Sequence, residues 1–295
     1  MQDSTMNLKL VCDAKAALAE GPVWDTVKGC LYWVDILGQK LHIHYPNEPE
    51  SDKTIECTPY VSSVVPRLSG GLVITLQNGF HTFDPDTNEI SLLAEMEEAL
   101  TDNRFNDGKC DPAGRFLAGT MSMKDKPSKG ALYCLDTDHS VKPLLSEVSI
   151  SNGLAWSSDN KIMYYIDTPT QQVVAFDYEI ETGAISERRV AVEISYPGFP
   201  DGMTIDSEGM IWVAHWGGWC VTRWNPFTGQ QLASIPVPAS QVTSCTFGGP
   251  NLDKLYISTA RIGLSEDELA KQPHAGGIFC ADLGIRGTPA IPYLG

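Results

Sequence analysis

The stretch FNDGKCDPAGRFLAGT, residues 105–120, carries a pattern that returns in SNGLAWSSDNKIMYYID from residue 151 and in PDGMTIDSEGMIWVAH from residue 200. Each copy begins with an amide or carboxylate side chain, followed within two residues by glycine. An apolar run, a polar turn and a second apolar run come next. Short apolar runs separated by turns rich in Asp, Asn, Ser and Gly are typical of strands joined as hairpins. The three copies therefore predict a repeated antiparallel β unit.

The unit repeats along the whole chain. Its reference positions lie 40 to 49 residues apart, at Glu20, Pro66, Asn106, Asn152, Asp201 and Cys245. A period of this length, with about four short strands per unit, is the signature of a propeller blade. We therefore predict an all-β fold, a six-bladed β-propeller with four-stranded antiparallel blades around a central channel. Residues 1–295 would form this single domain.

Two segments lie outside the repeated pattern. The N-terminal run NLKLVCD, residues 7–13, has strand character and precedes the first unit. We expect it to pair with GGIFCADL, residues 276–283, so that the ring closes and no sheet edge is left open. The stretch SEDELAKQ, residues 265–272, is the one convincing helical turn.

Composition excludes several classes of partner. The net charge is −16, from 37 acidic and 21 basic residues, and no run of Lys or Arg is present, so we expect no nucleic-acid partner. Apolar runs are strand-length, which argues against a membrane span. The first residues lack a signal-peptide pattern and the eight cysteines are scattered without a CxxC pair. We therefore expect a cytoplasmic protein, acting as a monomer, with all its cysteines reduced.

The repeat predicts a site in the channel. If equivalent positions occupy equivalent places, Glu20, Asn106, Asn152 and Asp201 point into one mouth of the channel. Any one Asn or Asp before Gly is explained as a turn former. Four polar residues at a common phase, including Glu20, favour a site instead.

Oxygen ligands decide the kind of metal that such a site would hold. Carboxylate and amide oxygens, without His or Cys at these positions, suit Ca²⁺, Mg²⁺ or Mn²⁺ better than a zinc site with soft ligands. We therefore expect one divalent ion, with Ca²⁺ as the first choice and Mg²⁺, Mn²⁺ and Zn²⁺ as alternatives.

Several motifs together resemble one family. They are AEGPVW (19–24), NRFNDGKCDPAGRFLAGTM (103–121), ISNGLAWS (150–157), FPDGMTID (199–206), SCTFGG (244–249) and QPHAGGIF (272–279). Over essentially the whole chain they resemble the family of regucalcin (senescence marker protein), gluconolactonase and luciferin-regenerating enzyme. The resemblance implies a six-bladed propeller that holds one divalent metal and hydrolyses sugar-acid lactones, with a small sugar lactone as its partner molecule.

The resemblance also implies roles for individual residues. The metal ligands of the family fall on Glu20, Asn152 and Asp201. The residues that bind substrate fall on Arg104 and Asn106. The catalytic acid and base falls on Asp201, which would take a proton from the attacking water and return one to the leaving ring oxygen.

The sequence departs from the family at Met123. In GTMSMK this methionine stands where the family has an acidic residue that contacts the substrate. An apolar side chain cannot accept a hydrogen bond from a sugar hydroxyl as a carboxylate does, which leaves the identity of the lactone open. Asp107 is interpreted as a turn or backbone-capping residue, His215 as a packing residue, and Arg104 alternatively as one half of a surface salt bridge.

Two functions of other classes remain open at this stage. The first is a non-enzymatic calcium-binding regulatory protein of the regucalcin type, which metal-dependent lactone hydrolysis would distinguish. The second is a scaffolding propeller, which gives no reason for a ring of oxygen ligands. Related six-bladed lactonases also leave other substrates open.

Overall fold

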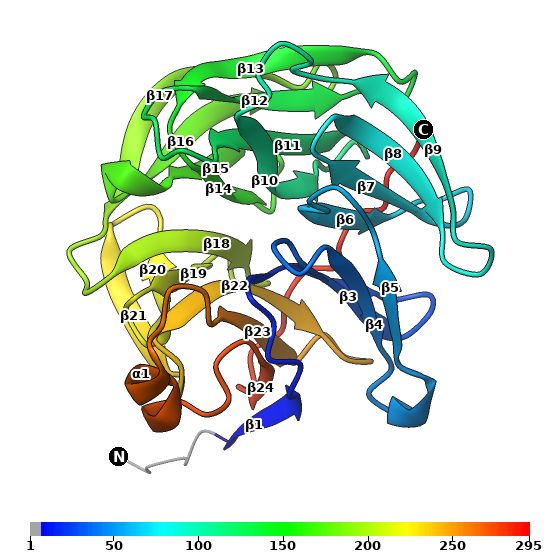
Figure 1. Cartoon of the computed structure of the whole chain (residues 1–295). Coiled ribbons are helices and arrows are strands. Elements are labelled where there is room, and N and C mark those ends of the chain that lie inside the picture. Colours follow the sequence, from blue (N-terminus) through cyan, green and yellow to red (C-terminus); the bar gives the residue numbers. More distant parts are fainter. Residues whose placement is uncertain (1–6) are drawn as a thin grey trace.

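The computed structural model describes residues 7–295, which form antiparallel β-sheets arranged as expected for a propeller (Figure 1). Within this range four sheets have four strands each. They are β2 (Ala19–Asp25), β3 (Cys30–Asp35), β4 (Lys40–His44) and β5 (Lys53–Glu56); β6 (Ser63–Pro66), β7 (Leu72–Leu76), β8 (Gly79–Asp84) and β9 (Glu89–Glu95); β10 (Asn103–Cys110), β11 (Phe116–Ser122), β12 (Gly130–Leu135) and β13 (Val141–Val148); β14 (Ser151–Trp156), β15 (Ile162–Asp167), β16 (Gln172–Glu179) and β17 (Ala184–Glu193).

The other eight strands of this range form one sheet made of two groups of four. The groups are β18 (Phe199–Ile205), β19 (Ile211–Trp216), β20 (Cys220–Asn225) and β21 (Gln230–Pro236); and β22 (Gln241–Gly248), β23 (Lys254–Ala260), β24 (Ile278–Asp282) and β1 (Asn7–Cys12). They are joined where Trp216 pairs with Gln241. Strand β1 runs antiparallel to β24, with Leu10 opposite Phe279, so the predicted partner of the N-terminal run is confirmed.

The helical segments are short. The predicted helical turn is confirmed as α1 (Glu266–Lys271), which starts with a capping box between Ser265 and Glu268. Two 3₁₀ turns, η1 (Pro49–Ser51) and η2 (Thr168–Thr170), complete the helical segments of the described chain. None of the helices in residues 7–295 has the length and apolar character that crossing a membrane requires.

The first strand of each group, called here an inner strand, lies nearer the middle of the molecule than the last strand (Figure 1). The inner strands are β2, β6, β10, β14, β18 and β22, and each contacts the inner strand of the next group along the chain. Strand β22 in turn contacts β2. The fold therefore brings together the segments that carry the reference positions of the sequence repeat.

The hydrophobic core is divided among the spaces between neighbouring sheets. Phe80 of β8 meets Phe105 and Phe116 of the next sheet, with ring centroids 5.1 and 5.6 Å apart. Trp24 of β2 stacks on Tyr256 of β23 with centroids 5.6 Å apart. Since the apolar contacts lie between the sheet faces, polar side chains can occupy the middle.

Turns between the first two strands of several groups are held by an Asp side chain. Asp111 Oδ1 accepts hydrogen bonds from the backbone N–H of Ala113 and Arg115, both at 2.9 Å, and Asp206 makes an equivalent pair. Asp111 Oδ2 also accepts from Arg115 Nε at 2.6 Å and from the Tyr178 hydroxyl. Because Tyr178 lies in β16 of the next sheet, this buried ion pair ties two sheets together.

Replacing Asp111 by Ala leaves Arg115, which is 3% exposed, without its carboxylate. Loss of one partner of a buried ion pair costs about 3–5 kcal/mol, and we expect a decrease of this size in the free energy of unfolding measured by urea denaturation. Asp84→Ala is the control, because Asp84 accepts from Asp86 N at 2.8 Å in an exposed turn. It should lose much less stability, because its carboxylate lies in solvent. Equal losses would contradict a stabilising role for the buried pair.

Candidate metal and substrate site

Five of the six inner strands, all except β6, share a local distortion at the end that carries the polar residues. The register of pairing with the next strand shifts between Glu20 and Val23, Phe105 and Gly108, Asn152 and Leu154, Pro200 and Met203, and Val242 and Ser244. Such β-bulges bend a strand and redirect a side chain, and they are common beside functional sites. In four of these strands the polar-glycine pattern of the sequence therefore coincides with a bulge.

Glycine follows the polar residues because the next inner strand comes very close. A Cβ atom on Gly153 would lie 3.0 Å from the carbonyl oxygen of Asp201 and 2.7 Å from Met203 Cβ. On Gly202 it would lie 2.8 Å from the backbone Cα of Ser244. A side chain at either glycine would push the inner strands apart at the level of the site.

The two amide side chains are in direct contact. Asn106 Nδ2 donates to Asn152 Oδ1 at 3.1 Å and to the carbonyl oxygen of Ser151 at 2.8 Å. Asn152 Nδ2 donates to Thr168 Oγ1 at 2.8 Å, and that hydroxyl donates to the carbonyl oxygen of Pro200 at 2.9 Å. These bonds connect β10, β14 and β18, so reference positions that are 46 and 49 residues apart in sequence lie side by side.

Arg104 belongs to the same network and is only 7% exposed. Its Nη1 donates to Asn106 Oδ1 and to the carbonyl oxygen of Phe105, both at 2.8 Å. The surface salt bridge that the sequence left open as an alternative is therefore wrong. Arg104 is a buried cation beside the amide pair.

Three buried carboxylates share one local arrangement. Glu20, Asp107 and Asp201 each accept a hydrogen bond from the backbone N–H of the glycine that follows, at 3.0 Å for Glu20 and 2.7 Å for Asp107. Within residues 7–295 that is the only hydrogen bond made by the side chains of Glu20 and Asp107. Their remaining acceptor positions are available to a ligand.

Electrostatics shows that these groups act on one another. Burial raises the pKa of Glu20 to about 8, with a further contribution from Asp107, while Arg104 opposes the rise. The pKa of Asp201 lies well above its ordinary value because of burial and of the negative charges on Glu20 and Asp107. Burial lowers the pKa of Arg104 to about 10, although the negative charges of Glu20 and Asp201 act to raise it. The site therefore holds an excess of negative charge that a cation would stabilise.

Asp107 faces a second cation, on the other side of the network. Burial lowers the pKa of Lys109 and the charge of Asp107 opposes this, while Lys109 in turn opposes the rise that burial causes in the pKa of Asp107. Lys109 Nζ donates to the carbonyl oxygen of Met203 at 2.6 Å. Both side chains line a cavity of about 340 Å³ between the far ends of the inner strands. Lys109 thus partly compensates Asp107, which leaves Glu20 and Asp201 to share the single positive charge of Arg104.

Sequence reasoning gave Asp107 only a backbone role. It does accept the backbone N–H of Gly108, but its charge also raises the pKa values of Glu20 and Asp201. The carboxylate-glycine pair, which Asp107 shares with Glu20 and Asp201, is the signal that could have placed it in the network.

Met123, the residue at which the sequence departs from the family, lies two positions after the strand partner of Arg104. Met123 is 36% exposed and follows β11, in which Met121 pairs with Arg104. Tyr60 and Asp125 both act electrostatically on Arg104. Neither of these two was a sequence candidate, and Asp125 places a carboxylate two positions beyond Met123.

The phase of the repeat needs correction in two units. The sequence assigned the second and sixth reference positions to Pro66 and Cys245, but Ser63 and Thr243 lie at the level of the other bulges. Thr243 Oγ1 donates to the carbonyl oxygen of Ala19 at 2.6 Å, next to Glu20. Inner strands differ in length, so equal spacing in sequence does not give equal depth in the channel.

Other sequence interpretations concern packing. His215 is fully buried and its Nε2 contacts Thr222 Oγ1, as a packing role requires, but its Nδ1 has no hydrogen-bond partner in the described chain. Burial lowers the pKa of His215 to about 4. All eight cysteines are free thiols, as expected.

The donor set fits a hard divalent cation. Glu20 and Asp201 supply two negative charges and Asn152 Oδ1 supplies a neutral oxygen, and the network described above includes no His nitrogen or Cys sulfur. Hard cations such as Ca²⁺ and Mg²⁺ prefer oxygen ligands of this kind.

Comparison with known proteins identifies the family to which this sequence is related. Residues 18–261 match the family described as SMP-30/Gluconolactonase/LRE-like region. The chain belongs to this family. YvrE of Bacillus subtilis, provisionally named a sugar lactone lactonase, is 42% identical over 98% of this chain and 99% of its own length. Regucalcin of Danio rerio is 43% identical over 99% of this chain and 100% of its own.

A solved structure extends this similarity to three dimensions. Regucalcin of Agrobacterium tumefaciens, described as a calcium-binding protein, is 27% identical and has a TM-score of 0.93, over 98% of this chain and 97% of its own. The family resemblance seen in the sequence motifs is therefore confirmed over nearly the whole chain.

The close approach of the inner strands leads to a prediction at Gly202. In Gly202→Ala the new Cβ would collide with the backbone of Ser244, and we expect a loss of about 1–3 kcal/mol in the free energy of unfolding, typical of overpacking. Metal affinity, measured by isothermal titration with Ca²⁺, should weaken as well. Gly209→Ala is the control: it strains a left-handed turn, but nothing lies within 4 Å of the added Cβ, so Ca²⁺ affinity should stay unchanged. Unchanged Ca²⁺ binding in Gly202→Ala would contradict the packing argument.

Proposed function

We propose that this protein is a metal-dependent lactonase that opens sugar-acid lactones in the channel of a six-bladed propeller. The observation that carries the proposal is the buried network of Glu20, Asn152 and Asp201 beside Arg104, in a member of a family that includes gluconolactonase. The oxygen donors and the surplus negative charge support the metal, and the family supports the lactone.

Six blades and a closed ring are part of this proposal. The successive contacts among the inner strands, ending with β22 against β2, support it. So does the pairing of β1 with β24, which would complete the last blade with the N-terminal strand. A closed ring would hold the site residues of distant units at fixed distances from one another.

Metal ligation in the proposed site falls to Glu20, Asn152 and Asp201. A divalent ion held there, Ca²⁺ first and Mg²⁺, Mn²⁺ or Zn²⁺ as alternatives, would supply Lewis-acid polarisation of the lactone carbonyl. Asn106 holds the Asn152 amide in place through its hydrogen bond to Oδ1.

Asp201 is the proposed general base. Without a metal, burial and the charges of Glu20 and Asp107 disfavour its ionised form. A bound divalent ion would oppose this effect and keep the carboxylate ionised, which a proton acceptor requires. Asp201 would take the proton of the attacking water and later deliver it to the ring oxygen that leaves. The same carboxylate thus serves both proton transfers.

Arg104 and Asn106 are the proposed substrate contacts. Arg104 uses Nη1 for its two contacts within the chain, so its remaining N–H donors are available to lactone oxygens. Its charge is favourable where negative charge develops on the substrate. Burial keeps water from competing for these donors.

Two variants distinguish a residue that acts as the general base from one that only binds the metal. Asp201→Asn keeps an oxygen ligand of similar shape but removes the proton acceptor, and we expect kcat to fall by about 10²-fold or more at saturating metal. Glu20→Gln has no proton-transfer role in this scheme, so its activity should recover largely as the metal concentration rises.

The measurement is the initial rate of acid release from a panel of aldonolactones, with spontaneous hydrolysis subtracted. Metal-stripped wild type should be inactive and regain activity with added Ca²⁺ or another divalent ion. A kcat near the wild-type value in Asp201→Asn would show that Asp201 is not the general base. If the wild type showed no metal-dependent rate on any lactone, the proposed lactonase function would be wrong.

Met123 leads to a prediction about substrate preference. Met123→Glu restores an acidic group at the rim, and we expect KM for hydroxyl-rich aldonolactones to fall about tenfold, the size of one hydrogen bond to a charged group. Met123→Leu keeps the apolar character and should leave KM unchanged. A KM that is the same in both variants would show that this position does not contact the lactone.

A calcium-binding regulatory protein is the second candidate function. It is favoured by the relatives named regucalcin, one of which is described as calcium-binding. In this case Ca²⁺ would bind the wild type without any associated lactone hydrolysis. The rate measurements above therefore separate the two functions.

A further inference from the structure

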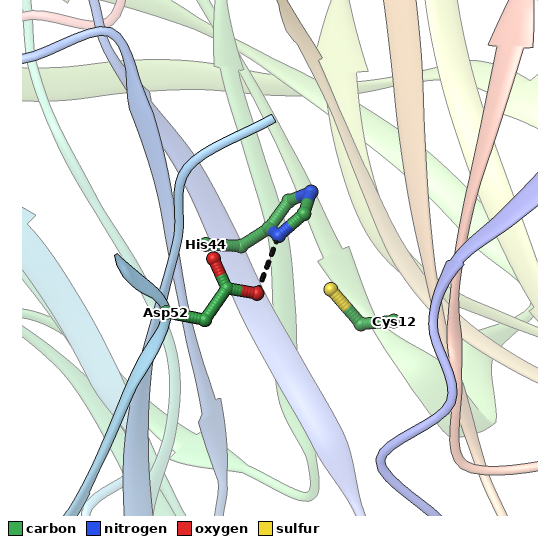
Figure 2. Close-up of side chains that lie close together, drawn as sticks. All are labelled: Cys12, His44 and Asp52. Carbon is green, nitrogen blue, oxygen red and sulfur yellow. Dashed lines mark hydrogen bonds and ion pairs between the residues drawn. The ribbon is translucent and has the colours of Figure 1, made fainter. Parts of the chain in front are cut away.

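A cluster of metal-binding side chains lies away from the channel network. It consists of Cys12, the last residue of β1, His44, the last residue of β4, and Asp52, which follows η1. Figure 2 shows the three side chains turned toward one another from three separate segments. Neither the repeat nor the family motifs include these residues, so the cluster is independent of the proposed lactonase.

The donor atoms are close enough to share one ion. One ligand atom from each residue lies within 4.8 Å of the other two. His44 Nδ1 and Asp52 Oδ2 are 2.8 Å apart. Zinc bonds of about 2.0 Å to N or O and about 2.3 Å to S place tetrahedral ligand atoms roughly 3.3–3.8 Å apart, so small side-chain rotations would suffice.

The carboxylate is already oriented for such a role. Asp52 Oδ1 accepts the backbone N–H of Tyr45 at 2.8 Å, which directs Oδ2 to the imidazole of His44. Hydrogen bonds of this kind fix the orientation of metal ligands in known sites. The His44 side chain is 5% exposed and that of Asp52 is 36% exposed, so the cluster is anchored inside but open to solvent on one side.

A nucleophilic role for the same residues is not supported. Burial and the charge of Asp52 raise the pKa of Cys12 to about 12, so its thiol is not activated at neutral pH. The Asp52 carboxylate and the cysteine also both approach the same side of the His44 ring (Figure 2). In a catalytic triad the acid and the nucleophile contact opposite ring nitrogens.

We propose that Cys12, His44 and Asp52 form a second metal site, one that takes Zn²⁺. Sulfur, nitrogen and oxygen donors together suit Zn²⁺ rather than the hard ions expected in the channel. A thiolate and a carboxylate would balance the two positive charges. On binding, the Cys12 proton is released to solvent and the His44 proton sits on Nε2, which leaves Nδ1 free to coordinate. Water would complete the four ligands from the exposed side.

The ion would join the two ends of the strand arrangement. Cys12 belongs to β1, which pairs with β24, whereas His44 and Asp52 belong to the group of β2–β5. A metal bond between these groups would fasten the N-terminal strand to the first sheet. Zn²⁺ would therefore stabilise the folded chain without taking part in lactone chemistry.

Cobalt reports such a site directly. The full-length protein, stripped of metal and then saturated with Ca²⁺, is titrated with Co²⁺ and followed by absorption. We expect one equivalent of Co²⁺ to produce thiolate-to-cobalt charge transfer in the near ultraviolet and the visible bands of tetrahedral cobalt. Added Zn²⁺ should abolish both signals and raise the thermal midpoint.

Matched variants assign the signals. Cys12→Ser should abolish the charge transfer and weaken Zn²⁺ binding by at least about 100-fold, since loss of a mere hydrogen-bond partner of a ligand already costs 10–100-fold. Asp52→Asn alters an exposed carboxylate, so it should fold normally and also bind Zn²⁺ more weakly. Cys280→Ser is the control, because Cys280 is the other partly buried cysteine and lies on the adjacent strand β24.

Three results would overturn the proposal. They are a wild type without charge transfer, a Cys12→Ser variant that keeps it, and a Cys280→Ser variant that loses it. Asp201→Asn should retain the signal, which separates this site from the proposed function. If no lactone hydrolysis were found, the cobalt signals would still be expected.

Discussion

Close approach of the inner strands is the constraint on which the channel network depends. At Gly153 and Gly202 the neighbouring backbone is so near that no side chain fits. The accompanying bulges interrupt the regular strand pairing beside each glycine. The polar residue there therefore has fewer hydrogen-bond partners in the neighbouring strand. Side chains that would be turn residues in isolation therefore meet across strands, as Asn106 and Asn152 do.

Burial of like charges is the energetic consequence of that packing. The charges of Glu20 and Asp107 raise the free energy of the ionised form of Asp201, and the charge of Asp107 does the same to Glu20. Burial removes the water that would stabilise these carboxylates. Arg104 compensates part of this charge, and Lys109 compensates Asp107. Such a network costs stability in the absence of a cation, and clusters of this kind are common at functional sites.

The two candidate metal sites differ in donor chemistry and in position. The first offers carboxylate and amide oxygens from the inner strands, whereas the Cys12 cluster combines sulfur, nitrogen and oxygen where β1 meets the first sheet. Hard and soft donors select different ions, so both sites could be filled in one chain without competition. The first would serve chemistry and the second would serve the connection between the chain's first strand and its first sheet.

The sequence by itself determined the strand-rich repeat, the pairing of the N-terminal run, the helical turn and the family, because each depends on local pattern or on motifs read in order. It did not determine the depth of Ser63 and Thr243, since the inner strands differ in length. It also missed the charge coupling of Asp107 and the approach of Cys12 to His44. Those contacts join residues from separate segments, and only the packing of the sheets decided which side chains share the low-dielectric interior and which face the solvent.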